Sequence, residues 1–265
     1  MQWFIYATAL ILGLLAGSFL NVVIYRAPAM LGLEGENRRA RGDLIAPRSH
    51  CPACRTQIRN VDLIPLFSFV ALRGKCRACG APIPLRYPIV ELLGAVAALS
   101  SIFIFDATLD AGFAALFFLA LIALGAIDHE TGYLPDAITL PLIALGLAAN
   151  IYGRFAAITD AVIGAALGYL VFALIAFGYE RLRGREGLGG GDAKLLAAIG
   201  AWGGWMILAP TVFIGALLAL SLIAASSLSG RKLDMTTPVR FGPALCLAGA
   251  AAFIALRLGL PLFAA

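Results

Sequence analysis

Apolar stretches of about 16 to 20 residues recur along this chain, and this recurrence restricts its fold more than any other feature. Each stretch is about as long as a helix must be to cross a hydrocarbon core of about 30 Å. Backbone polar groups in lipid must be satisfied within the segment, so the stretches are predicted to be helices. Only 13% of the residues are charged, against about 25% in soluble domains. The predicted fold class is an all-α polytopic membrane protein.

Eight transmembrane segments are expected, at residues 3–25, 88–105, 111–127, 137–152, 161–179, 193–209, 211–228 and 243–263. The first carries no charge before Arg26, whereas a cleaved signal peptide begins with a basic region, so this segment is expected to be retained. The predicted division of the chain is a first transmembrane helix at 1–25, a loop at 26–87 and a membrane domain at 88–265.

Basic residues are distributed unevenly between the loops. When residues 26–87, 128–136, 180–194 and 230–242 are placed on one side, that side holds every Lys and Arg except Arg154 and Arg257. Because Lys and Arg collect in cytoplasmic loops, these loops are predicted to be cytoplasmic, and an even number of spans is favoured. The same rule explains the net charge of +5, so no nucleic-acid partner is expected.

The loop at 26–87 carries two CxxC pairs, Cys51 with Cys54 and Cys76 with Cys79. Their spacing fits a tetrahedral zinc site with four cysteine ligands. The alternatives are disulfides or redox-active pairs, but a reducing cytoplasm disfavours stable disulfides and two matched pairs favour a metal. Zinc with four protein ligands is predicted to be structural. Cys246, alone in the last segment, is predicted to be a packing residue.

Two acidic residues lie at the ends of predicted membrane helices. Asp128 directly follows the segment at 111–127, and Asp192 closes the run GGGD at 189–192. Two carboxyl groups brought together from different helices do not both ionise cheaply, so they can share a proton. One can then act as general base on water while the other protonates or polarises a carbonyl, which is the chemistry of aspartic proteolysis. The alternative is that Asp192 is only a first-turn acid or helix cap.

Three further residues are expected to support this pair. Gly189 and Gly191 allow close backbone approach before the helix at 193, where an extended peptide could lie beside Asp192. Asp136 follows Leu134 and Pro135, a pattern typical of a helix start, which favours a structural role over direct chemistry.

The order of motifs resembles that of the type IV prepilin leader peptidase family (prepilin peptidase/N-methyltransferase), membrane aspartic proteases that share a GxGD motif. The resemblance runs over nearly the whole chain. The motifs are GSFLNVV at 17–23, the two CxxC pairs, RYPIVE at 86–91, Asp128 with LPD at 134–136, GGGD at 189–192 and FGP at 241–243.

The resemblance implies that Asp128 and Asp192 are the catalytic pair. The implied substrates are type IV prepilins and type II secretion pseudopilins, cleaved after a basic leader at the cytoplasmic face of the bacterial inner membrane. Many members also N-methylate the new N-terminus with S-adenosylmethionine, an activity associated with the first loop and with the position of Gly74. Glu130, Asp136 and Glu186 are hypothesised to attract the leader.

Two other classes of function remain open from the residues alone. A secondary transporter could use the aspartates as a proton relay, but it predicts acids near the middle of the bilayer and inverted repeats. A non-enzymatic membrane scaffold that displays a zinc ribbon would leave Asp128 and the GGGD run unexplained.

Overall fold

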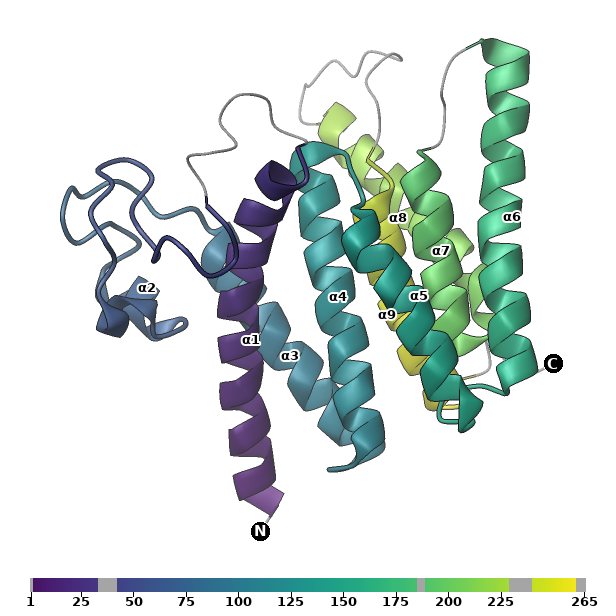
Figure 1. The fold of residues 1–265 in the computed structure, drawn as a ribbon, viewed down its shortest axis with the longest axis horizontal. Helices are drawn as coiled ribbons and strands as arrows, with labels where there is room; N and C mark the ends of the chain where they lie inside the picture. Colours follow the sequence, from purple (N-terminus) through teal and green to yellow (C-terminus); the bar gives the residue numbers. More distant parts are fainter. Residues whose placement is uncertain (1, 33–41, 185–188, 229–239, 261–265) are drawn as a thin grey trace. The chain divides into compact units, whose positions relative to one another are not determined.

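A computed structural model describes residues 2–32, 42–184, 189–228 and 240–260 (Figure 1). The chain is helical, and β-pairing in the described part is limited to two isolated bridges, His50 with Gln57 and Lys75 with Pro82. This confirms the predicted all-α fold class. The chain divides into two compact units, Met1–Ala123 and Leu124–Ala265.

The first unit is built around two helices in close contact, α1 (Gln2–Met30) and α3 (Arg86–Phe105). A Cβ atom added to Gly13 would lie 2.6 Å from the carbonyl oxygen of Gly94, and one added to Gly17 would lie 2.7 Å from Cα of Glu91. Small residues at such positions let helix backbones approach closely in a membrane. The cysteine loop between these helices contains η2 (Asn60–Leu63) and α2 (Phe67–Ala71). The unit ends within α4 (Leu109–Thr131).

The second unit contains the end of α4, α5 (Asp136–Ile151), α6 (Ile158–Arg183), α7 (Gly190–Gly203), η3 (Trp205–Ile207), α8 (Leu208–Leu228) and α9 (Gly242–Arg257). Nearly all of α7 is buried, as expected for a helix that is apolar on every side. It packs tightly on α6, since a Cβ atom added to Gly200 would lie 2.3 Å from the carbonyl oxygen of Gly164. Helix α7 is therefore the core of this unit.

Each of the eight predicted membrane segments overlaps a helix, but the boundaries and lengths differ. The segment predicted at 193–209 is divided at Gly204, where α7 ends, and that at 243–263 extends beyond the end of α9 at Arg257. Five spans are long and apolar enough to cross a bilayer within the described ranges: α1, α3, α4, α6 and the η3–α8 segment. Helices α5, α7 and α9 have 16, 14 and 16 residues, or roughly 21 to 24 Å at 1.5 Å per residue, less than the hydrocarbon thickness. The count of eight spans stays a prediction.

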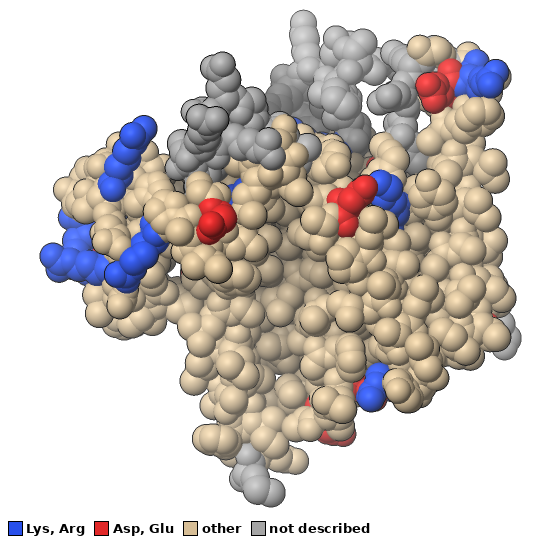
Figure 2. Space-filling view, in the orientation of Figure 1, with Lys and Arg blue, Asp and Glu red and all other residues tan. Residues whose placement is uncertain are grey.

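The distribution of charged side chains fits a membrane protein. On the face drawn in Figure 2, they gather on the cysteine loop and near helix ends, while the helix sides between them are uncharged. Many large apolar side chains point outward from these helices, among them Leu12 and Phe19 on α1 and Leu170 and Leu174 on α6. Lipid is the surrounding that suits such side chains.

A buried amide joins three segments of the second unit. The side-chain nitrogen of Asn150 donates to the carbonyl oxygens of Ala201 and Trp202, at 2.9 and 3.0 Å. Its oxygen accepts from the backbone N–H groups of Phe155 and Ala156, both at 3.0 Å. Asn150 thereby fixes the end of α7 against the turn that leads into α6.

Candidate functional site

The two predicted carboxyl groups both lie in the second unit, near enough to interact electrostatically. Asp128 lies near the end of α4 and Asp192 in the first turn of α7, and both are buried, with 6% and 8% of their surface exposed. The two carboxyl groups interact electrostatically, and the buried Cys246 of α9 interacts with both. Residues 64 positions apart in the sequence thus lie close together, beside a third helix.

The backbone of Gly242 forms one wall of this site. A Cβ atom added to Gly242 would lie 2.6 Å from Oδ2 of Asp128 and 2.8 Å from its Cγ, so no side chain fits there. Oδ2 of Asp128 is buried and has no hydrogen-bond partner within the described residues. Buried polar atoms in proteins usually have a hydrogen-bond partner, so this oxygen is an exception.

The glycines before Asp192 differ in what surrounds them. Gly189 is the N-cap residue of α7, and its carbonyl oxygen accepts from the backbone N–H of Asp192 at 3.0 Å. A Cβ atom on Gly191 would lie 2.9 Å from Cβ of Leu134, whereas one on Gly190 would meet nothing within 4 Å. A Cβ atom on Gly189 would lie 3.7 Å from Oδ2 of Asp192, an ordinary contact, so only the third glycine is sterically constrained.

Asp136 is held in an ion pair. It is the first residue of α5, after the N-cap residue Pro135, and both of its carboxylate oxygens accept from Nζ of Lys194, at 2.6 and 2.8 Å. Lys194 lies two residues after Asp192. The LPD segment therefore touches α7 on both sides of Asp192, through Leu134 at Gly191 and through Asp136 at Lys194.

Sequence reasoning missed three neighbours of the pair: Lys194, Gly242 and Arg240. Arg240 is exposed, interacts electrostatically with Asp128, and its Nε lies 3.9 Å from where a Cβ on Gly132 would be. Two of these neighbours could have been found from their positions in the sequence. Lys194 lies two residues after the GGGD run, and Arg240 immediately precedes FGP. Of the residues hypothesised to attract a leader, Glu130 is exposed and Glu186 lies outside the described residues.

The four cysteines of the first unit form a compact cluster. The sulfur atoms of Cys51, Cys54, Cys76 and Cys79 all lie within 4.8 Å of one another, and those of Cys51 and Cys79 are 3.9 Å apart. Four thiolates at about 2.3 Å from a tetrahedral zinc ion would be separated by about 3.8 Å. The donor set and its spacing therefore fit a metal ion.

The two CxxC pairs adopt the same local structure. In each, the N–H of the first cysteine donates to the carbonyl oxygen five residues later, Thr56 for Cys51 and Ala81 for Cys76, at 3.0 and 2.8 Å. The residue after each second cysteine has positive φ, +58° for Arg55 and +72° for Gly80. Two equivalent turns thus present two sulfur atoms each.

Local hydrogen bonds favour the thiolate form of Cys54 and Cys76. The backbone hydrogen bond of Ala81 lowers the pKa of Cys79, but the neighbouring thiols and burial outweigh it and raise this pKa to about 11. The hydroxyl and backbone of Thr56 lower the pKa of Cys54 to about 6. The backbone N–H groups of Cys79 and Ala78 lower the pKa of Cys76. Since the thiolate is the form that binds metal, both shifts favour metal binding.

Gly74 has a conformation that favours glycine. Its φ is +67°, and an added Cβ would lie 3.1 Å from the ring of Phe69 in α2. Its N–H donates to the carbonyl oxygen of Phe69, and its carbonyl oxygen accepts from the backbone N–H of Ile83. Gly74 thereby links α2 to the segment that follows the second CxxC pair.

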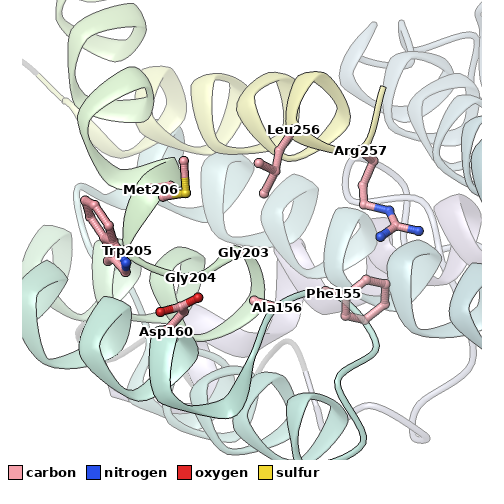
Figure 3. Close-up of a pocket in the computed structure, with 9 residues that line it drawn as sticks. All are labelled: Phe155, Ala156, Asp160, Gly203, Gly204, Trp205, Met206, Leu256 and Arg257. Carbon is pink, nitrogen blue, oxygen red and sulfur yellow. The ribbon is translucent and has the colours of Figure 1, made fainter. Parts of the chain in front are cut away.

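A pocket of about 300 Å³ lies at the other end of α7 from Asp192 (Figure 3). It is lined by Phe155, Asp160, Gly204, Trp205, Leu256 and Arg257, among others. Its carboxylate is that of Asp160. Gly203 is eleven positions beyond Asp192 along α7, which separates the two places by roughly 17 Å. This pocket does not hold the carboxyl pair.

Comparison with known proteins identifies the relatives of the chain. Residues 11–105 match the bacterial peptidase A24 N-terminal domain, and residues 115–224 match the type IV leader peptidase family. No solved structure matches.

Three of these relatives are named prepilin leader peptidase/N-methyltransferase. The protein of Dickeya chrysanthemi is 43% identical over 264 residues, which cover 94% of this chain and 92% of the relative. That of Pseudomonas aeruginosa is 42% identical over 252 residues, covering 91% and 87%. That of Burkholderia pseudomallei is 41% identical over 259 residues, covering 92% and 84%. The chain belongs to the type IV leader peptidase family.

Proposed function

We propose that this protein is a membrane aspartic endopeptidase that removes the basic leader from type IV prepilins, with Asp128 and Asp192 as its catalytic pair. The observation that carries the proposal is the convergence of two buried carboxyl groups from α4 and α7. The substrate class follows from the names of the relatives. Pseudopilins of type II secretion are included on the resemblance of the sequence motifs to the family.

The chemistry follows from one proton shared between two carboxyl groups. The ionised carboxylate removes a proton from a water molecule, whose oxygen attacks the carbonyl carbon of the scissile peptide bond. The protonated carboxyl donates its proton to the carbonyl oxygen. The tetrahedral intermediate then collapses, the C–N bond breaks and the leaving amine takes up a proton. Removal of either carboxyl group stops this sequence, because acid and base are both required.

We place the site at the cytoplasmic face of the bacterial inner membrane. The distribution of Lys and Arg supports this orientation. A prepilin would carry its basic leader in the cytoplasm and its apolar helix in the bilayer, so the junction would lie at that interface. Asp136 is paired with Lys194 and so contributes less to attraction of the leader than its charge alone suggests.

Zinc is proposed as a structural ion held by Cys51, Cys54, Cys76 and Cys79. With four sulfur ligands it would join the two turns of the loop and have no open coordination position, so it would support the fold of the loop without taking part in cleavage.

Methyl transfer from S-adenosylmethionine is proposed from the relatives' names. A pocket of about 470 Å³ in the loop is lined by Arg48, Gln57, Arg59 and Asn60, among others. Two guanidinium groups suit an anion and oppose a sulfonium cation, so this pocket does not fit the donor. Gly74 is the only residue that we connect with methyl transfer, and the connection rests on the family resemblance.

The test is cleavage of a purified prepilin by the full-length protein in lipid vesicles. Asp128→Asn and Asp192→Asn should each reduce cleavage at least 1,000-fold. Asp160→Asn, a first-turn acid of α6 at the opposite end of α7, is the matched control and should cleave normally. Cleavage near the wild-type rate in either of the first two variants would exclude that residue as an essential acid or base.

A further inference from the structure

The register of α1 and α3 fixes the depth of Glu91. An added Cβ on Gly17 would lie 2.7 Å from Cα of Glu91, so these residues lie at one level. Arg26, the first charged residue of the chain, is nine residues further along α1, or about 13 Å. Trp3 lies about 21 Å from Gly17 in the other direction. Because the bilayer hydrocarbon is about 30 Å thick, Glu91 lies within or at the edge of that layer.

The cysteine loop is attached at this level by a buried carboxylate. Oε2 of Glu91 accepts from the backbone N–H of Leu66 at 2.8 Å, and its carboxylate also interacts with the hydroxyl of Ser18. Leu66 has φ +58°, a conformation rare for a residue with a side chain, and it immediately precedes α2. Figure 1 shows α2 to the left of α1, lower in the view than the end of that helix. The residue that precedes α2 is therefore tied to Glu91, which lies level with Gly17 and nine residues before Arg26 on α1.

The side chains that α2 presents at this depth are apolar and exposed. Phe67 is 67% exposed and Val70 is 73% exposed, and Val61 and Ile64 just before them are also exposed. Such a patch on a water-facing loop would be unfavourable, and it marks a surface that contacts something apolar.

Basic residues flank the apolar patch. Arg48 and Arg59 line the 470 Å³ pocket together with Asn60 and Val61, so cationic and apolar side chains adjoin there. Arg73 follows α2 two residues after its end. An apolar surface bordered by arginines at the edge of the hydrocarbon is complementary to anionic phospholipid.

We propose that residues 60–73 form an interfacial anchor that lies in the bilayer surface. Phe67 and Val70 insert among the upper acyl chains, and Arg48 and Arg59 bind the phosphate groups of anionic phospholipid. The anchor holds the cysteine loop against the membrane independently of the peptidase reaction.

The experiment uses the full-length protein in phosphatidylglycerol vesicles that contain a phospholipid with a photoactivatable diazirine near the glycerol end of its acyl chain. After illumination, trypsin cleaves beside Arg41, Arg48, Arg59 and Arg73, which separates the peptide 60–73 from the control peptide 42–48. The control contains Ile45, which is 90% exposed, in a segment bound by Arg26 through the carbonyl oxygens of Asp43 and Pro47.

The anchor predicts at least ten-fold more lipid adducts on 60–73 than on 42–48. Phe67→Ser with Val70→Ser should remove most of this excess. Arg48→Gln with Arg59→Gln removes two cleavage sites, so its peptides are 42–55 and 56–73, and the yield on 56–73 should fall to that of the wild type in phosphatidylcholine. Equal labelling of the two peptides would overturn the proposal. So would labelling of 60–73 that disappears when prepilin is added, because the patch would then be a protein-binding surface.

Discussion

At the scale of single residues, the carboxyl group of Asp128 occupies the space where a side chain at position 242 would lie. The FGP motif therefore needs a glycine at its second position because a side chain there would collide with Asp128, 114 residues earlier in the chain. Gly191 is explained in the same way by Leu134. No periodicity or spacing in the sequence predicts these contacts, because they depend on which helices become neighbours.

Gly242→Ala should displace Asp128 and reduce prepilin cleavage by about 100-fold, because misplacement of a reacting group by about 1 Å has an effect of that order. Gly190→Ala is the matched control, since an added Cβ there meets nothing within 4 Å, and it should cleave at nearly the wild-type rate. Initial cleavage rates in vesicles measure both. Normal cleavage by Gly242→Ala would contradict the described packing of Asp128.

Asn150→Ala should reduce the free energy of unfolding by about 2 to 4 kcal/mol. The change removes both hydrogen bonds to α7 and both to the turn, and it leaves buried donors and acceptors without partners. Thermal unfolding in detergent measures the loss. Thr108→Ala removes a single bond, to Phe105, and should have a much smaller effect.

At the scale of secondary-structure elements, the site depends on how α5 and α7 begin. The Asp136–Lys194 pair joins the two helix starts, and the short link from Asp128 to Asp136 connects α4 to the same place. Both side chains of the pair are partly exposed, so its contribution to stability should be below about 1 kcal/mol. Its expected role is to position Asp192.

Asp136→Asn and Lys194→Gln should therefore each lower kcat for cleavage by about tenfold with little change in KM. The double variant should be no worse than the poorer single variant, because each residue acts through the other. Losses that multiply in the double variant, or a rise in KM alone, would show separate roles such as leader binding.

The two CxxC turns are equivalent, with Gly80 in one at the position of Arg55 in the other. Adding a side chain at one position and removing it at the other should therefore change zinc affinity in opposite directions. Gly80→Ala introduces a side chain at φ +72° and should weaken zinc binding about fivefold, which corresponds to about 1 kcal/mol. Arg55→Gly relieves the same strain at φ +58° and should strengthen binding by a similar factor. Competition with a chelator measures both affinities. Effects of the same sign would refute the equivalence of the turns.

At the scale of the whole molecule, composition and charge distribution predicted the helical membrane fold, because lipid leaves the backbone few alternatives. The CxxC spacing predicted the cysteine cluster because ligand geometry is local. The sequence did not reveal the contacts at Gly17, Gly94, Gly164 and Gly200, where helix backbones approach closely. Nor did it reveal the four hydrogen bonds of Asn150, since such contacts depend on three-dimensional packing. Short helices such as α7 were expected as spans, although α7 is surrounded by protein.

The central claim is that Asp128 and Asp192 act as one unit on one peptide bond. Single-turnover cleavage of a prepilin by Asp128→Asn, Asp192→Asn and the double variant tests it most directly. We predict that each single change abolishes at least 99.9% of the rate, as in units whose members depend on one another, and that the double change reduces it no further. Substantial cleavage in a single variant, or losses that multiply in the double variant, would contradict a shared catalytic role.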